Sequence, residues 1–263
     1  MVFCLFQKKV VPLHKINYLH FYSMNNMKRG FFLSLVLGFW ALASFAQVQP
    51  TDTNYMVSLH TGYAHNLTYG SYASFDLDAY LPIHQHFDMQ VNLRTSTANS
   101  HSLGVKLRPK FALPVGELYI EDRLMMRFVA RDEFNEFLHA ISLGYMMEYV
   151  NVQVGVYTRV IQPLPYVPRS EDELICEPFD VLYRVEAFVR PRTSPWNISL
   201  ALSNVDNYQI ERMWQPMFYL GGWYDINEHW RVRMSGKMKL AGMFHLNAHY
   251  YASELRVGAE YRF

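Results

Sequence analysis

The most regular feature of the chain is an alternation of apolar and polar residues with a period of two. The segment 230–240 shows it most clearly, since its charged positions are all basic. Its apolar set is Trp230, Val232, Met234, Met238 and Leu240, and its basic set is Arg231, Arg233, Lys237 and Lys239. Side chains point to opposite faces of a strand in turn. This segment is therefore predicted to be a strand with one apolar face and one basic face.

The same signal recurs from Asn54 onward, in about twelve segments. Clear alternation runs through 75–81, 87–94, 103–113, 152–160, 181–190 and 230–240. Weaker alternation occurs near 55–64, 117–128, 137–149, 196–203, 214–225 and 247–263, and within 117–128 it slips at Asp122. The pattern predicts an all-β chain.

The connections between these segments show a second regularity. After every second segment the connection is short, at 83–86, 114–116, 149–151, 191–195 and 225–229. The connections between them are mostly longer and more polar, at 66–71, 95–101, 130–135, 162–178, Val205–Glu211 and 242–249. Short turns on one side and longer external loops on the other are typical of transmembrane barrels. We therefore predict an antiparallel up-and-down barrel of about 12 strands, with both ends of the barrel on the short-turn side.

The last ten residues repeat the pattern and end on an aromatic residue. Leu255, Val257, Ala259, Tyr261 and Phe263 share one face, and Glu254, Arg256, Glu260 and Arg262 share the other. This ending resembles the closing strand of bacterial outer-membrane β-barrel proteins. The resemblance covers the architecture of residues 47–263 and rests on no specific family motif. It implies an outer-membrane location, contact with outer-membrane lipid, and an assembly signal at Tyr261 and Phe263 that the barrel-assembly machinery reads.

The amino-terminal region has the layout of a secretory signal. A basic start at Met27–Gly30 precedes an apolar run from Phe31 to Leu42 and then Ser44-Phe45-Ala46. This order predicts a signal peptide at residues 27–46 that is cleaved after Ala46. Residues 1–26 show no clear period, so translation from Met27 is favoured over an unusually long leader. The expected mature chain is a single barrel domain at 47–263.

Composition narrows the classes of function. Hydrophobic residues make up 51% of the chain and the net charge is +1. A nucleic-acid partner is not expected, because such proteins carry a basic stripe. Of the two cysteines, Cys4 lies in the doubtful extension, so Cys176 would stand alone in the mature chain and an internal disulfide is excluded.

Alternation by itself fits either a membrane barrel or a soluble β-protein with its apolar face inward. Several features favour the membrane. The polar faces carry several Arg and Lys on single strands, and the chain ends on Phe263. Aromatic residues also lie at segment ends beside short turns, where a girdle at the lipid interface would place them. These residues are Trp196, Trp223, Tyr224 and Trp230.

If lipid covers the apolar faces, the polar faces line the lumen. The candidate pore-lining residues are Arg94, Lys106, Arg108, Arg184, Arg190, Arg231, Arg233, Lys237, Lys239, Arg256 and Arg262. Rings of Arg and Lys favour anions in pores. The same charges can instead pair across strands as an ordinary stabilising network.

The leading functional hypothesis is a narrow passive pore with a modest anion preference, in which Arg231, Arg233, Lys237 and Lys239 form one wall. The sequence does not identify the small solute that would pass through the pore. The main alternative is a closed structural or interaction barrel whose function lies in its external loops. A lipid-modifying barrel enzyme is the third hypothesis.

No strong enzymatic motif is present. Ser58 and His60 share a face, but that face is expected to point into the lumen. His84 and His86 flank a turn without a third metal ligand nearby in the sequence. We therefore predict no catalytic residues, no metal site and no cofactor.

Overall fold

The computed structural model describes residues 55–68, 70–129, 134–163, 175–241 and 249–263. The predicted signal peptide and the preceding extension lie outside these ranges. Within them, no helix is long and apolar enough to cross a membrane.

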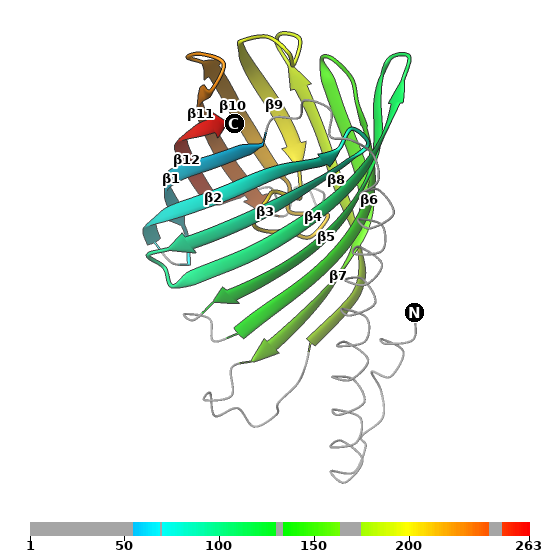
Figure 1. The fold of residues 1–263 in the computed structure, drawn as a ribbon. Helices are drawn as coiled ribbons and strands as arrows, with labels where there is room; N and C mark the ends of the chain where they lie inside the picture. Colours follow the sequence, from blue (N-terminus) through cyan, green and yellow to red (C-terminus); the bar gives the residue numbers. More distant parts are fainter. Residues whose placement is uncertain (1–54, 69, 130–133, 164–174, 242–248) are drawn as a thin grey trace. The chain divides into compact units, whose positions relative to one another are not determined.

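The described residues form one closed antiparallel barrel of twelve strands (Figure 1). Each strand pairs with its neighbours in the sequence, and β1 closes the ring against β12. The predicted fold class and strand number are confirmed. The strands are β1 (Met56–Asn66), β2 (Gly70–His84), β3 (Phe87–Ser96), β4 (Ser100–Leu113), β5 (Gly116–Val129), β6 (Phe134–Met146), β7 (Val150–Pro163), β8 (Ile175–Phe188), β9 (Trp196–Ser203), β10 (Met217–Asp225), β11 (Trp230–Ala241) and β12 (His249–Arg262).

The alternation along the strands separates an apolar exterior from a polar interior. On β1, Leu59 and Tyr63 are 63% and 61% exposed, whereas Ser58 and His60, the two chain neighbours of Leu59, are buried. The same alternation holds along β2, where Phe75 and Leu77 are exposed and Asp76 is buried. A soluble barrel would bury the apolar set instead. This arrangement excludes the soluble alternative.

The irregularity at Asp122 has a different meaning from the one that the sequence suggests. β5 pairs with β6 without any shift in register, so the alternation of faces continues through this point. Glu121 and Arg123 are buried in the interior, and Asp122 points outward between them. The strand does not slip: a polar residue occupies a position on the apolar exterior.

Five of the six connections predicted to be long are shorter than predicted, most clearly the first two. β1 and β2 are joined by residues 67–69, and β3 and β4 by residues 97–99, because the strands continue further than the alternation indicates. Four of the five short turns on the other side are confirmed, and the connection between β8 and β9, residues 189–195, is longer than the predicted 191–195. The described ends of the chain also lie on that side, since the Phe263 amide donates to the Tyr55 carbonyl at 2.9 Å and the Arg262 amide to the His229 carbonyl at 2.8 Å.

Aromatic residues gather at the short-turn rim, with one exception. Trp230, Tyr261 and Phe263 lie against one another on the exterior, with ring centroids 4.9 Å apart in each successive pair. Trp223 was also predicted to face lipid, and this is wrong. Trp223 pairs in register with the inward-facing residues Asn197 and Arg233. The guanidinium carbon of Arg233 lies 5.8 Å from the centroid of the Trp223 ring. Cation–π attraction accounts for an indole inside a charged lumen.

Candidate functional site

The connection between β9 and β10 folds into the barrel. We call residues 204–216 the inner loop. Val205, Tyr208 and Ile210 in this segment are almost fully buried. Val205–Glu211 was predicted to be an external loop, and the structure corrects this. Its alternation of apolar and charged residues suits an environment that offers both kinds of partner, as the lumen does.

The inner loop is a small hairpin with its own hydrogen bonds. Val205 and Ile210 form an antiparallel bridge, and the Glu211 amide donates to the Asn204 carbonyl at 2.7 Å. At the tip, the Asp206 carboxylate accepts the backbone amides of Tyr208 and Gln209 at 2.7 and 2.8 Å. Asp residues commonly organise turns in this way. The loop therefore reaches the lumen as an ordered element.

Apolar residues anchor one side of the inner loop. Val205 and Ile210 belong to a buried cluster whose other members come from the wall formed by β5 to β8. These wall residues are Met125, Leu138, Ala140, Tyr157 and Leu182. Their inward position also weakens the alternation of the segments near 117–128 and 137–149. Part of the lumenal wall is therefore apolar, and the inner loop docks on this apolar surface.

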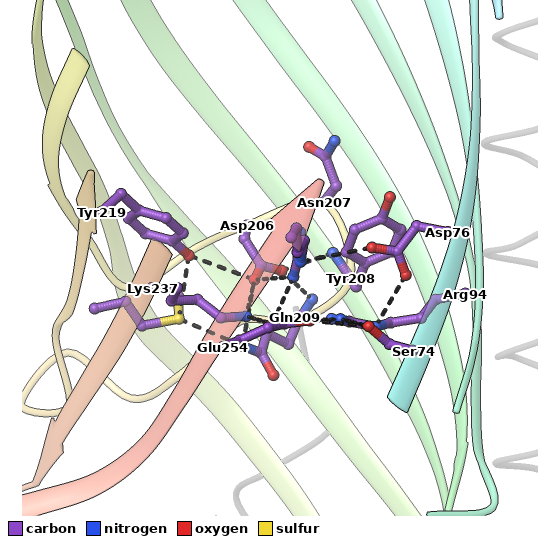
Figure 2. Close-up of polar contacts among 12 residues, drawn as sticks. Ser74, Asp76, Arg94, Asp206, Asn207, Tyr208, Gln209, Tyr219, Lys237 and Glu254 are labelled. Carbon is purple, nitrogen blue, oxygen red and sulfur yellow. Dashed lines mark hydrogen bonds and ion pairs between the residues drawn. The ribbon is translucent and has the colours of Figure 1, made fainter. Parts of the chain in front are cut away.

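Ion pairs hold the tip on the opposite side (Figure 2). The Asp206 carboxylate lies 2.8 Å from the Lys237 ammonium and 3.7 Å from the Arg256 guanidinium. From the β5 wall, Arg123 donates to the Asp206 carbonyl oxygen. Burial by itself raises the pKa of the Asp206 carboxyl, but Lys237 and Arg256 outweigh burial and hold this pKa well below its usual range. The carboxylate is therefore charged at neutral pH.

A second layer of charges supports Lys237. Glu254 lies 2.7 Å from the Lys237 ammonium, pairs with Arg94, and accepts the Ser74 hydroxyl at 3.2 Å. Arg94 also lies 3.1 Å from Asp76. Figure 2 shows these side chains meeting from β2, β3, β11 and β12 beneath the tip. The network fixes the position of the ammonium that receives Asp206.

Tyr208 is the aromatic element of the tip. Its hydroxyl lies 2.8 Å from both carboxylate oxygens of Asp78, and its ring makes cation–π contacts with two guanidinium groups. Arg94 and Arg256 are 4.9 and 5.0 Å from the ring centroid. Burial, followed by the charge of Asp78, raises the pKa of Tyr208, so the phenol stays protonated and donates its hydrogen bond. Tyr208 ties the loop to the β2 wall.

The inner loop crosses the lumen. Its stem emerges between β9 and β10, and its tip residue Asn207 bonds to the ammonium of Lys106 on β4. In the closed ring, β4 is six strands away from β10, which is half of the circumference. The tip also lies close to Gly104, where a Cβ would stand 3.4 Å from the Asn207 carbonyl oxygen. The loop therefore divides the interior rather than lining one wall.

Further contacts secure the stem. Lys239 donates to Gln209 at 2.8 Å and pairs with Glu211 at 2.7 Å. Arg159 donates to the Ile210 carbonyl oxygen, and the Tyr157 hydroxyl donates to the Glu211 carbonyl at 3.2 Å. Backbone carbonyls that leave the strand ladder thus find donors on the wall, as buried carbonyls require.

The predicted pore-lining residues fall into separate groups. One group holds the inner loop directly or through its neighbours: Arg94, Lys106, Lys237, Lys239 and Arg256. Arg108 and Arg184 pair along the wall, with Glu121 and Glu186 respectively. Arg190 is exposed in the β8–β9 connection, with its guanidinium 3.7 Å from the Trp196 ring centroid, and so it lies at the rim.

The remaining three arginines form a basic cluster at the short-turn end of the lumen. Arg231 and Arg262 share Asp225, at 2.5 and 2.9 Å, and Arg233 pairs with Glu260 at 2.8 Å. Three guanidinium groups therefore face two carboxylates. We call these three arginines the basic vestibule. The Arg233 side chain is 41% exposed, so it remains within reach of solutes.

The sequence indicated the charged lumenal faces of the strands, but it did not indicate that acidic and aromatic residues of the inner loop enter the lumen. Asp206, Tyr208 and Glu211 were placed outside the barrel. Mixed apolar and charged residues in a connection expected to be solvated are the one signal that could have indicated an inward fold. Ser58 and His60 do face the lumen as predicted, and both are buried. Among the described residues, no group of three or more His, Cys, Asp or Glu side chains is arranged to hold a metal ion.

Comparison with known proteins defines the class. The translocator domain of the autotransporter NalP from Neisseria meningitidis has a TM-score of 0.53 at 13% identity, over 92% of this chain and 97% of its own. An outer membrane channel from Pseudomonas putida F1 has a TM-score of 0.52 at 9% identity, over 82% and 100%. The KdgM porin reaches 0.45 at 10% identity, over 78% and 99%. No protein-family model and no curated protein matches the chain.

At these identities the likeness concerns the fold. This closed antiparallel barrel with an apolar exterior has the fold of bacterial outer-membrane β-barrel proteins, two of which match 92% and 82% of the chain. The outer membrane is accordingly its location. Structures of lower similarity include porins and also an outer membrane phospholipase A from Escherichia coli, at a TM-score of 0.44, 12% identity and coverage of 84% and 96%.

Proposed function

We propose that the protein is a narrow pore whose lumen is constricted by the inner loop. The supporting observation is the loop itself, which crosses a polar lumen and is held there by ion pairs. Eight strands already leave an interior just wide enough for side chains to fill, so twelve strands enclose more space than side chains alone occupy. A single inserted segment then sets the width available to a solute.

We propose further that the pore prefers anions. Ion pairing is extensive, but basic groups exceed acidic ones at two places. In the basic vestibule, three guanidinium groups face Asp225 and Glu260. Along β3 to β5, Asp88 and Glu121 are shared among several basic side chains. Fixed positive charge in a confined passage favours anions.

The anion preference can be tested at the basic vestibule. We expect Arg231→Gln together with Arg233→Gln to reduce the anion selectivity of the channel, because both charges are removed while the inner loop keeps its partners. The measurement is the reversal potential in a salt gradient across a planar bilayer. The difference between variant and wild type should shrink at about 1 M salt, where the Debye length is about 3 Å.

Lys237→Gln together with Lys239→Gln is the matched control. It removes the same number of charges from the same strand, but from residues that bind the inner loop. We expect this variant to change conductance more than selectivity. A cation-selective wild-type channel would refute the anion preference, and would instead point to the acidic set of Asp76, Asp78, Glu254 and Glu260.

A second function is favoured by the tight docking of the loop. The apolar cluster around Val205 and Ile210 resembles a small protein core, and such packing can close a barrel completely. On this alternative, the barrel is a structural or interaction protein, with activity in its external loops. Well-inserted wild-type protein without conductance would support the closed barrel and would contradict an open pore.

We also propose that Tyr261 and Phe263 guide assembly through the barrel-assembly machinery. Aromatic side chains anchor strands at the membrane interface, and these two pack with Trp230 at the short-turn rim. We expect Phe263→Lys to lower the amount of folded barrel in the outer membrane severalfold, measured by heat-dependent gel migration of membrane fractions. Tyr149→Lys, at another exposed aromatic beside a short turn, is the control and should have a smaller effect. Equal losses would contradict a specific role.

A further inference from the structure

A polar patch interrupts the lipid-facing exterior. Asp122 on β5 and His139 on β6 both point outward, and the Asp122 Oδ1 lies 2.9 Å from the His139 Nε2. Their side chains are 35% and 40% exposed, respectively. Thr158 on β7 pairs in register with His139 and continues the patch onto a third strand. We call these three residues the exterior polar patch.

The exterior polar patch lies at the depth where lipid is least polar. Asp122 is midway along β5, and His139 is near the middle of β6. The outward residues around them are exposed and apolar: Ile120, Met126, Ile141, Leu143, Val154 and Val156. A lipid headgroup does not reach the middle of a strand that crosses the whole hydrocarbon layer.

Polar groups at this depth carry a cost unless they are covered. Charged substitutions on the lipid face destabilise barrels most at the midplane, although acidic residues less than basic ones. The bond between Asp122 and His139 satisfies one oxygen and one ring nitrogen. Among the described residues, neither the second carboxylate oxygen nor His139 Nδ1 has a hydrogen-bonding partner. Ionisable residues inside membranes are rare and usually mark a site with a partner.

We propose that the exterior polar patch is an interface with a second copy of this chain. Two barrels in one membrane can be related by a two-fold axis along the membrane normal. This rotation keeps each residue at its depth in the membrane and places the left side of one contact surface opposite the right side of the other. Asp122 and His139 stand two positions apart in the β5–β6 register, and their side chains meet at 2.9 Å, so a two-fold axis beside this contact brings the acid of one copy opposite the imidazole of the other. The patch is complementary to itself, and the surrounding apolar residues supply a surface for packing.

Cysteine cross-linking in the native membrane tests this proposal. The background replaces Cys176, and Cys4 where it is retained, with Ser. Ile141→Cys places a thiol on the exterior beside the patch, and Leu59→Cys places one on β1 at an exterior position that is 63% exposed. We expect mild oxidation to yield a disulfide-linked dimer with Ile141→Cys and little with Leu59→Cys. Heat-dependent gel migration confirms that each variant is folded.

The polar pair is then removed in the Ile141→Cys background. Asp122→Leu together with His139→Leu suits a lipid-facing surface, so the barrel should fold, but we expect dimer formation to fall about tenfold, which corresponds to roughly 1.4 kcal/mol. Undiminished dimer formation would overturn the proposal. Equal cross-linking at both cysteines, no cross-linking at either, or a product whose mass is not twice that of the chain would overturn it as well. The outcome does not depend on whether the lumen conducts.

Discussion

Removal of the inner loop is expected to increase the single-channel conductance several-fold. Ser203 and Met217 are partners in the β9–β10 register, so residues 204–216 can be replaced by a two-residue Asn-Gly turn, which suits adjacent antiparallel strands. The variant loses the element that crosses from β10 to β4, while every strand and its pairing partners stay in place. Conductance in planar bilayers at fixed salt is the measurement.

The matched control is a deletion of similar length between β7 and β8. That deletion also shortens the chain but leaves all described contacts of the inner loop intact, so it should not reproduce the increase. If wild type and the inner-loop deletion conduct equally, the loop does not set the width of the passage, and the proposed constriction is wrong. If only the deletion variant conducts, the wild-type barrel is plugged, and the inner loop is the plug.

The second large effect is expected from a single substitution at the tip. Asp206→Asn removes the charge that faces Lys237 and Arg256, and the two cations are then left buried with less compensation. Removing one partner of a buried ion pair costs about 3–5 kcal/mol of stability. Glu254 still neutralises Lys237, so we expect a value nearer the lower end. A loss of about 3 kcal/mol would shift the balance between docked and released loop by about 100-fold.

Single-channel recordings of this variant should therefore show a larger share of time in a high-conductance state. At neutral pH the wild-type carboxyl is charged, because its pKa lies well below the usual range. Glu186→Gln is the control, since it disrupts the Arg184 pair on the wall, and neither residue bonds to the inner loop. Long-lived closed states in Asp206→Asn that match those of wild type would show that the ion pairs at the tip do not hold the loop.

The sequence by itself determined the architecture of the barrel. Alternation with a period of two requires no knowledge of distant neighbours, because each residue's face follows from its place in the strand. The set represented by Leu59 and Phe75 therefore indicates the exterior, and the set represented by Arg94 and Lys237 indicates the lumen. The order of short and long connections adds the antiparallel topology. Even the interruption at Asp122 was visible, although its placement on the exterior was not.

Only the tertiary structure decided what the lumenal charges do. Tyr208 meets Asp78 across 130 positions of sequence, and Lys106 meets Asn207 across 101. The mixed apolar and charged residues of Val205–Glu211 are the one local signal of an inward fold, and this signal does not decide the matter, because the choice depends on partners contributed by β2, β4, β11 and β12. The closed ring brings these strands around one interior. A basic side chain on the lumenal wall anchors the inner loop only if the fold places a loop carboxylate within a few ångströms of it. The strength of that Coulomb interaction depends on the distance between the charges and on their burial.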